Sequence, residues 1–497
     1  MSAIHGEVLG MPLGLMFRHF LMIVDSPLRT PSALVKLKRR LLVPVRLIIK
    51  LERWRGNRLA DWIRRRIIAL QPGLESLPRF LRNRDDFILW VPPGWHLKDA
   101  DYSRAKRLFE NRQARSLAQV VSCDDWLPSR DGKRLRWREK ARLDPFLDKR
   151  INFADGPLWL SKALVDCCGL PPEEVEQRPA WRAKVLKHVG FDGWAHVPLP
   201  LAVSPQPWRP HAVPGKPTRQ GLVSVLIPSG GFLKIVDGRK KILLRHCLEA
   251  LLQRSEYRNI EIILVHGGEF SGSQLVEYEQ LVESSLGPNR WKSVCDSRPY
   301  SYSLRMNLAA STAAGEYFLQ LNDDTEILEP EALGSMVSLL NDMKVGVVGS
   351  LLLYPGGRVQ HAGVFIDNLA PSHPWAGVWP KRLPVDLLSS PRQFQAVTAA
   401  VCMCRSETWK SLSGLREDLP VNYGDVDFCL RARQKGLMVI LDPSSRWMHF
   451  ESASRVLATV PAELPRFREL WSEGLGGARC IDPYNFRWRE LRSSLSV

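Results

Sequence analysis

GEYFLQLNDDTEILEP occupies residues 315–330. The apolar run 317–321 predicts a short buried strand, and Asn322, Asp323 and Asp324 follow it directly. Two carboxylates about 4 Å apart repel by roughly 4 kcal/mol at an effective dielectric near 20. No Lys or Arg lies between Arg305 and Lys344. A distant basic residue, a raised pKa or a bound cation must therefore offset the repulsion.

Oxygen ligands of this kind suit Mg²⁺ or Mn²⁺, which share phosphate oxygens with a bound substrate. Open α/β sheets bind ligands at the carboxyl ends of their strands. We therefore expect residues 322–324 to hold a divalent cation and a nucleotide diphosphate. The alternative is an acidic turn that caps the helix after Pro330, and an Asp-Asp turn alone favours that alternative.

Length and charge indicate a multidomain chain with an anionic partner. The 497 residues suffice for two or three domains, and the formal net charge is +18. Between Lys36 and Arg66 there are twelve basic and two acidic residues. Residues 1–86 therefore predict basic amphipathic helices, which either lie on a membrane surface or pack on the next domain with a solvated basic face. No nucleic-acid recognition motif is present, so a nucleic-acid partner is not expected.

The cysteines and the apolar segments bear on the compartment. Nine cysteines without a C-x-x-C pair predict reduced thiols and a cytoplasmic protein. The apolar stretch 9–24 is interrupted by Arg18 and His19 and lacks a cleavage site. We therefore expect neither secretion nor a transmembrane helix, but possible peripheral attachment to the inner face of the cytoplasmic membrane.

Four further segments follow the basic region. Residues 87–203 look like a degenerate internal repeat of the central motif at an offset of 230, in which Pro92-Pro93-Gly94 stands where the acids should be. Residues 204–221 form a proline-rich linker. Residues 222–455 alternate strands and helices, which predicts an α/β domain with a mainly parallel sheet and helices on both faces. Residues 456–497 are expected to form a helical tail.

Two later segments carry candidate groups. The small-residue run 394–405 predicts a strand that floors a pocket. Asp425 and Asp427 begin a predicted helix, where the dipole keeps a carboxylate ionised, and such a group can accept a proton from a sugar hydroxyl. The alternative is an ordinary N-cap. His449 is a ligand candidate only if the fold returns it to the Asp pair.

From about Leu222 to Asn485 the chain resembles the family 2 glycosyltransferases, which have the Rossmann-like GT-A fold of nucleotide-diphospho-sugar transferases. Bacterial rhamnosyltransferases and O-antigen or capsule glycosyltransferases are the members it is most similar to. The resemblance rests on the order of seven motifs: VSVLIP, LLRHCLEALL, YSYSLRMNLAASTAAGEYFLQLNDDTEILEPEAL, LLLYPGGRVQHAGV, VTAAVCMCR, YGDVDFCLRARQKG and HFESASR.

The resemblance implies a role for each matching residue. Asp324 would be the main metal ligand, with Asp323 and His449 beside it, and Asp425 would be the catalytic base. Pro228, Asn307, Asn322 and Asp323 would line the donor site. Two departures fall on the nucleotide side: His266 replaces the Asp of an Asp-Gly-Ser turn, and Ser229-Gly230-Gly231 replaces a Thr-x-Asn turn.

The expected function is inverting, metal-dependent transfer of a hexosyl or deoxyhexosyl group in surface polysaccharide biosynthesis. The expected donor is a UDP- or TDP-sugar, and the expected acceptor is a glycan or lipid-linked glycan. Because the departures fall on the nucleotide side, a catalytically inactive scaffold that binds glycan or nucleotide is the alternative.

Overall fold

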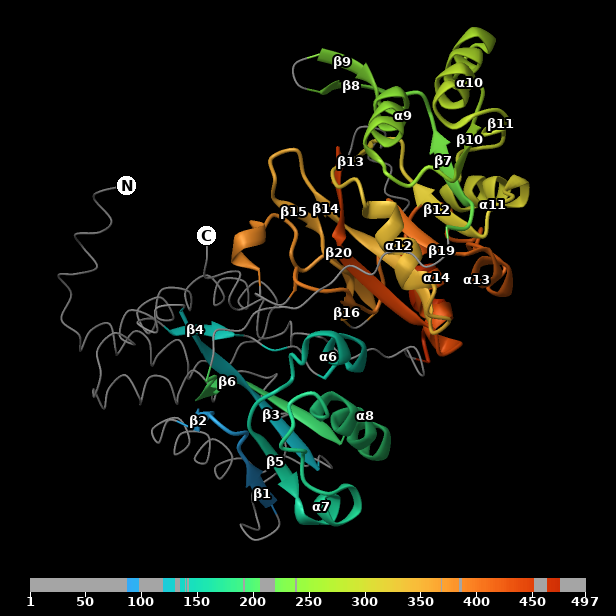
Figure 1. The fold of residues 1–497 in the computed structure, drawn as a ribbon. Coiled ribbons are helices and arrows are strands. Elements are labelled where there is room, and N and C mark those ends of the chain that lie inside the picture. The colour runs from blue at the N-terminus through green and yellow to red at the C-terminus, as the bar shows by residue number, and fades with distance from the viewer. Residues whose placement is uncertain are drawn as a thin grey trace, which may run out of the picture. The chain divides into compact units, whose positions relative to one another are not determined.

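The computed structural model (Figure 1) describes the chain between residues 87 and 473, with gaps. The described residues are 87–97, 119–129, 135–138, 140, 143–190, 193–205, 220–236, 239–367, 369–383, 387–450 and 463–473. The predicted basic helices of residues 1–86, most of the linker and most of the tail lie outside them. No helix among the described residues is both long and apolar enough to cross a membrane.

The first sheet is small and mixed, with strand order β1-β5-β3-β6-β2, and β4 pairs with β3. Helices α7 and α8 lie on the same side of it (Figure 1). Its elements are β1 (Phe87–Trp90), β2 (His96–Leu97), β3 (Val120–Pro128), β4 (Leu135–Arg138), α6 (Pro145–Ile151), β5 (Leu158–Ser161), α7 (Lys162–Cys168), α8 (Arg178–Val189) and β6 (Trp194–Val203).

The second sheet is the scaffold of the candidate site, and its strand order is β11-β10-β7-β12-β19-β14-β20-β13. Its first elements are β7 (Val223–Ser229), β8 (Leu233–Val236), β9 (Arg239–Ile242), α9 (Leu243–Arg254), β10 (Ile260–His266), α10 (Gly272–Leu286), β11 (Trp291–Cys295), α11 (Tyr302–Thr312), β12 (Tyr317–Leu321), β13 (Thr325–Ile327) and α12 (Ala332–Leu340). The later ones are β14 (Val345–Leu353), β15 (Val359–His361), β16 (Phe365–Asp367), β17 (Ala370–Ser372), η2 (Pro380–Arg382), β18 (Arg392–Gln393), β19 (Val401–Arg405), α13 (Ser406–Ser411), α14 (Gly424–Gln434), β20 (Met438–His449) and α15 (Glu463–Leu470).

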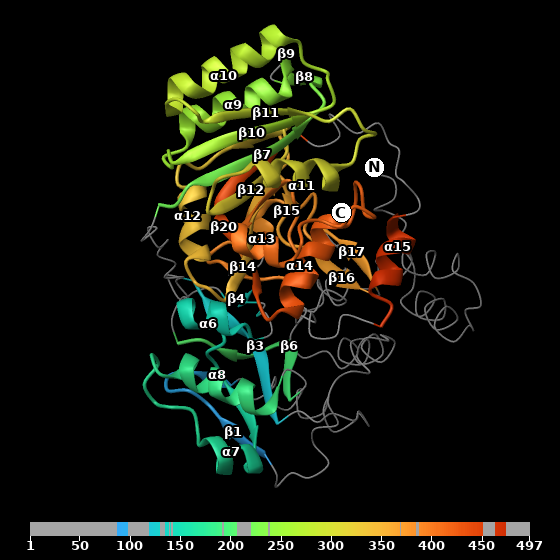
Figure 2. The same cartoon turned by 90° about the vertical axis from the view of Figure 1, so that its right-hand side faces the viewer.

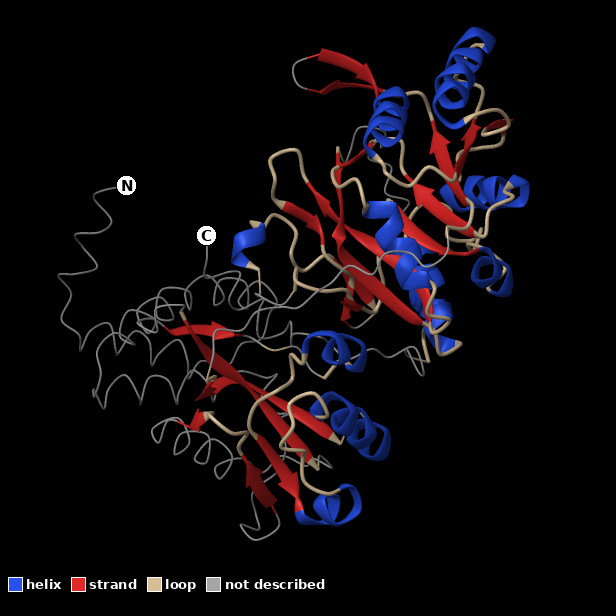
Figure 3. Cartoon of the chain, in the orientation of Figure 1, coloured by secondary structure: helices blue, strands red, loops and turns tan. Residues whose placement is uncertain are grey.

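Alternating residues of this sheet enter two separate cores, as the pleat of a strand requires. Val225 and Leu319 pack with helices α9, α10 and α12, whereas Leu226 and Phe318 pack with α11, α13 and α14. Figures 2 and 3 show the helices on both faces of the strands. The predicted α/β class with helices on both faces is therefore confirmed.

The prediction of a mainly parallel sheet is wrong in its second half. Strands β11, β10, β7 and β12 are parallel, but β19 runs antiparallel to both of its neighbours, β12 and β14. The described residues between β14 and β19 contain short strands and a 3-10 turn but no α-helix, so they lack the crossover helix that usually joins parallel strands.

Two predicted element boundaries also differ. Residues 239–242 form β9 of a hairpin rather than the start of the predicted helix, which begins at Leu243. The strand predicted over 394–405 begins only at Val401. The backbone N–H groups just before Val401 bind side chains instead of a neighbouring strand, so that residues 398–400 form a turn.

Candidate active site

Asn322, Asp323 and Asp324, called the Asp turn below, follow β12 at the carboxyl end of the parallel strands. Asp323 is 4 % exposed and Asp324 is 3 % exposed. Ser229, the last residue of the neighbouring strand β7, donates its hydroxyl to Asp323 Oδ2 at 2.5 Å. Burial, and then the charge of Asp324, raises the pKa of Asp323 to about 7.

His449 is brought to the Asp turn by strand pairing. Thr325 in β13 lies opposite His449 in β20, and Phe450 N donates to the carbonyl of Asp324 at 2.9 Å. As a result His449 Nε2 lies 3.0 Å from Asp324 Oδ1. The other ring nitrogen, Nδ1, lies 2.7 Å from Gln360 Oε1. The fold therefore meets the condition under which His449 becomes a candidate ligand.

The repulsion expected at this strand end is offset in more than one way. Glu326 pairs with two residues of α9: His246 Nε2 at 2.9 Å and Arg254 Nη1 at 2.5 Å. The hydrogen bond from His246 is the main reason that the pKa of Glu326 lies below its usual value. Asp323 instead has a raised pKa. A distant basic residue and a shifted pKa, two of the three predicted solutions, are thus both present.

The surroundings of Asp324 suit binding of a cation better than acceptance of a hydrogen bond. Its Oδ1 is buried and has no aligned hydrogen-bond donor among the described residues, although His449 Nε2 is close. Carboxylate oxygens and an imidazole nitrogen are suitable ligands for Mn²⁺ and Mg²⁺. No three acidic, His or Cys side chains in the described ranges are arranged to hold a metal by themselves. A cation here would need further ligands from phosphate or water, as Mg²⁺ usually does.

Asp425 lies in the first turn of α14, as predicted. Its Oδ1 accepts from Val426 N at 2.8 Å and its Oδ2 accepts from Ala399 N at 3.0 Å. It is half-buried, and no ion pair is formed with it by any described residue. Asp427, in contrast, is buried and binds Arg431 at 2.7 Å and Trp471 Nε1 at 3.2 Å. Asp427 therefore stabilises the fold through its two partners, and Asp425 is the acid that remains a candidate for proton transfer.

The turn of residues 398–400 joins the base to the Asp turn. Ala399 N donates to Asp425, and the carbonyl of the next residue, Ala400, accepts from Asn322 N at 3.0 Å. Consecutive Cα atoms are about 3.8 Å apart. Asp425 and Asn322 are therefore anchored to consecutive residues of one turn, which places the candidate base beside the candidate cation site.

Glu463 is a site residue that sequence reasoning missed. From the start of α15, this buried carboxylate accepts from the backbone N–H of Val421 at 3.1 Å and of Asn422 at 2.5 Å. These residues immediately precede α14, so Glu463 fixes the approach to Asp425. No local pattern reveals this, because the contact joins residues 41 positions apart.

The residues predicted to line the donor site differ in their surroundings. Pro228 is buried in β7 opposite Val265, beyond the point where the pairing of β7 with β12 ends, so its missing N–H costs no bond to β12. The amide of Asn307 exchanges two hydrogen bonds of 2.9 Å with the backbone of Leu415. Donor contacts by Pro228, Asn307, Asn322 and Asp323 stay predictions.

A second set of buried polar groups lies where β10 and β11 end. His266 is buried at the end of β10, and its carbonyl accepts from Asp296 N at 2.7 Å. Burial lowers the pKa of His266. Asp296 Oδ2 and two nitrogens of Arg305, Nε and Nη1, have no hydrogen-bond partner among the described residues. This edge thus offers both unpaired donors and an unpaired acceptor.

Comparison with known proteins finds a family match over part of the second sheet. Residues 240–365 match the sequence model of the glycosyl transferase family 2. An uncharacterized protein, y4gI, of Sinorhizobium fredii (strain NBRC 101917 / NGR234) is 33% identical over 303 residues, 59% of this chain and 30% of that protein. The O-antigen biosynthesis protein RfbC of Myxococcus xanthus is 35% identical over 227 residues, 44% of this chain and 17% of that protein. The chain thus spans less than a third of the length of these relatives.

Among solved structures, that of GalNAc-T7 with UDP, GalNAc and Mn²⁺ is 14% identical, with a TM-score of 0.41, over 56% of this chain and 51% of that one. This likeness is too distant to support an argument about the site. The family match spans the Asp turn and much of the second sheet, from α9 to β16. Residues 240–365 of the chain therefore have the sequence of a family 2 glycosyltransferase segment.

Proposed function

We propose that this chain transfers a sugar, with inversion at the anomeric carbon, from a nucleoside diphosphate donor to a hydroxyl of a glycan or lipid-linked glycan during surface polysaccharide biosynthesis. The observation that carries the proposal is the joining of Asp425 and Asn322 to consecutive residues of one turn, Ala399 and Ala400. This places one ionisable group without an ion pair next to a cluster of acids whose charges are only partly offset.

Inversion needs one base and no protein nucleophile. Asp425 would take the proton of the acceptor hydroxyl while the acceptor oxygen bonds to the anomeric carbon and the bond from that carbon to the diphosphate breaks. Two backbone N–H groups hold the Asp425 carboxylate, so its orientation is set before the acceptor binds. The relation of RfbC to O-antigen biosynthesis supports a glycan as the acceptor class.

We further propose that Asp324 and His449, with Asp323, hold Mn²⁺ or Mg²⁺. When bound, such a cation would neutralise charge on the diphosphate. The protein's own part is to keep the ligands in place: the β13–β20 pairing fixes His449, and Ser229 fixes Asp323. At the end of β10, the unpaired groups of Arg305 and Asp296 suit the polar edge of a nucleobase.

Calorimetric titration of UDP, TDP and GDP, each with and without Mn²⁺, tests the proposal on the wild type and on Asp324→Ala. We expect one of them to bind only with Mn²⁺, and Asp324→Ala to lose that binding. Glu326→Gln is the matched control, because Glu326 follows the same turn but pairs with α9. If the folded wild type binds none of the three, a non-catalytic scaffold replaces the proposal.

A further inference from the structure

His361, the last residue of β15, contacts the backbone of the 398–400 turn and is 1 % exposed. Its Nε2 accepts from two backbone groups, Gly363 N at 3.3 Å and Thr398 N at 3.4 Å. Its Nδ1 lies 2.9 Å from Nδ1 of His373. Each ring nitrogen of a nearly inaccessible side chain is therefore committed to one particular direction.

These contacts determine where the proton of His361 lies. A nitrogen that accepts from backbone N–H groups carries no proton of its own, so a neutral His361 is protonated at Nδ1 and donates to His373. Burial, and then the charges of His373 and His449, hold the pKa of His361 well below its usual value. A neutral ring is therefore the state that the surroundings favour.

The backbone that His361 holds is the backbone that holds the base. Thr398 N–H points to His361, and the next N–H, that of Ala399, points to Asp425 Oδ2. The carbonyl of Ala399 accepts from the Tyr302 hydroxyl at 3.2 Å. Since neighbouring peptide planes share a Cα atom, a rotation at Thr398 would redirect the Ala399 N–H.

We propose that His361 is a positioning residue for Asp425, acting through the N–H groups of Thr398 and Ala399. The inference rests on the proposed function, because it assigns His361 a purpose only if Asp425 is the base. A carboxylate turned away from the acceptor would lower the turnover rate without weakening donor binding, and a misplacement of about 1 Å can cost about a hundredfold in rate.

The first sheet supports the assignment. Strand β4 pairs with β3 as β15 pairs with β14, and Arg138 lies opposite Asp125 where His361 lies opposite Leu352. Arg138 forms an ion pair with Asp125 at 2.5 Å. In the first sheet, helix α8 takes the place of α14 but has no acid in its first turn. Arg138 takes the place of His361. The first sheet therefore lacks both the candidate base and the histidine.

The test uses three variants that separate the two nitrogens. His361→Gln keeps an acceptor near the position of Nε2, His361→Asn keeps a donor near Nδ1 but loses that acceptor, and His361→Leu loses both. His196→Leu is the matched control, because His196 is also buried and hydrogen-bonded at both ring nitrogens, at 2.9 Å each, but lies in the first sheet.

Two readouts are measured on the full-length protein. One is release of nucleoside diphosphate from UDP-glucose, TDP-rhamnose and GDP-mannose with Mn²⁺, as kcat and KM. The other is amide hydrogen exchange of peptides that cover residues 394–405. We expect His361→Leu and His361→Asn to lower kcat about a hundredfold, to leave donor KM close to wild type, and to exchange faster at the 398–400 turn. His361→Gln should restore both values.

The outcomes separate the two hypotheses. Unchanged kcat in a folded His361→Asn variant overturns the positioning role, and so does an equal loss in His196→Leu. If only KM rises, His361 acts on donor binding and the inference is wrong. A wild type that neither binds nor releases any diphosphate overturns the proposed function itself, and the positioning role with it. His361→Asn carries the test if His361→Leu does not fold.

Discussion

The five strands β12-β19-β14-β20-β13 of the second sheet and the five strands β1-β5-β3-β6-β2 of the first have the same order. Their directions also agree: the first two pairs and the last are antiparallel, and the third is parallel. In both sheets a bulge interrupts the parallel pair, after Ser350 in one and after Cys123 in the other. The first sheet therefore has the strand order and strand directions of the part of the second sheet that runs from β12 to β13.

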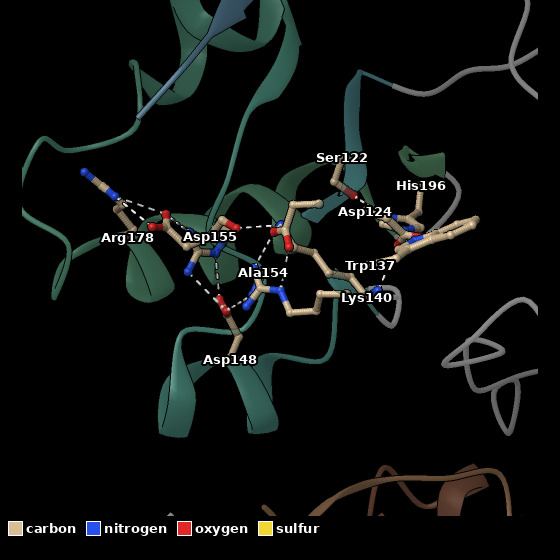
Figure 4. A network of polar contacts seen from close by, with 12 residues as sticks. Ser122, Asp124, Trp137, Lys140, Asp148, Ala154, Asp155, Arg178 and His196 are labelled. Atoms are coloured by element: carbon tan, nitrogen blue, oxygen red, sulfur yellow. Dashed lines mark hydrogen bonds and ion pairs between the residues drawn. The ribbon is translucent and has the colours of Figure 1, made fainter. Parts of the chain in front are cut away.

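The two sheets differ in what their acids do. In the first sheet the buried acids have partners of opposite charge or hydrogen-bond donors. Arg138 and Lys140 bind Asp125. His196 and Trp137 bind Asp124 (Figure 4). The end of β1 has Pro92-Pro93-Gly94 in place of the Asp turn. In the second sheet Asp323 has a raised pKa, and Asp324 Oδ1 accepts no hydrogen bond among the described residues, although His449 Nε2 lies 3.0 Å away. The acids of the first sheet thus contribute to its stability through their partners, whereas those of the second sheet can bind a ligand.

The largest expected effect concerns the base. Asp425→Asn keeps the size of the side chain and one acceptor, but it cannot take a proton, so transfer should fall about a thousandfold. Binding of the diphosphate with Mn²⁺ should persist. Kinetics and calorimetry on the same preparation check this. Glu176→Gln, an exposed acid just before helix α8 of the first sheet, is the control and should change neither value. Loss of diphosphate binding in Asp425→Asn would contradict the assignment.

The second effect concerns the stability of the first sheet. Burial by itself would raise the pKa of Asp125, but Arg138 and Lys140 outweigh it and the pKa lies below its usual value. A depressed pKa contributes stability that is present above the unfolded-state value, about 3.9, and is lost as pH falls through the folded value. Asp125→Asn should therefore cost about 3 kcal/mol at pH 7 and less at pH 3, which lies below the unfolded-state value.

Thermal unfolding of wild type and Asp125→Asn at both pH values measures this difference. Diphosphate binding at 20 °C should be unchanged, because we assign the first sheet no ligand. Asp166→Asn, an acid of α7 without an ion pair among the described residues, serves as the control. A gap between the two proteins that stays the same from pH 7 to pH 3 would contradict the pairing.

The smallest effect concerns the residue in the middle of β14. Gly349 lies opposite Cys402, as Ser122 lies opposite Leu158 in the first sheet. A Cβ atom at Gly349 would collide with the side chain of Val397, just before the 398–400 turn. Gly349→Ser, which introduces the residue of the other copy, should cost about 2 kcal/mol and lower turnover by displacing that turn.

Chemical denaturation and kcat measure this third prediction. Gly356→Ser is the control, because a Cβ atom there meets nothing within 4 Å. If Gly349→Ser kept the wild-type turnover rate, the 398–400 turn would tolerate displacement. The close packing around Gly349 would then be unnecessary for catalysis.

The sequence alone determined the local features. The apolar run before the Asp turn predicted β12, the acids at 425 and 427 predicted the start of α14, and the order of motifs predicted the family. Each of these signals is carried by neighbouring residues, so hydrophobic patterning and helix-start chemistry suffice to find it.

Only the tertiary structure decided how these features meet. Strand β19 reverses direction, β20 carries His449 to Asp324, and Glu463 reaches the backbone before Asp425. Residues 398–400 of the strand predicted over 394–405 form instead the turn that connects the base, the Asp turn and His361. These contacts join residues far apart in the chain through backbone groups, and every residue type except proline carries the same backbone N–H. Sequence patterns therefore cannot encode them, and packing selects them.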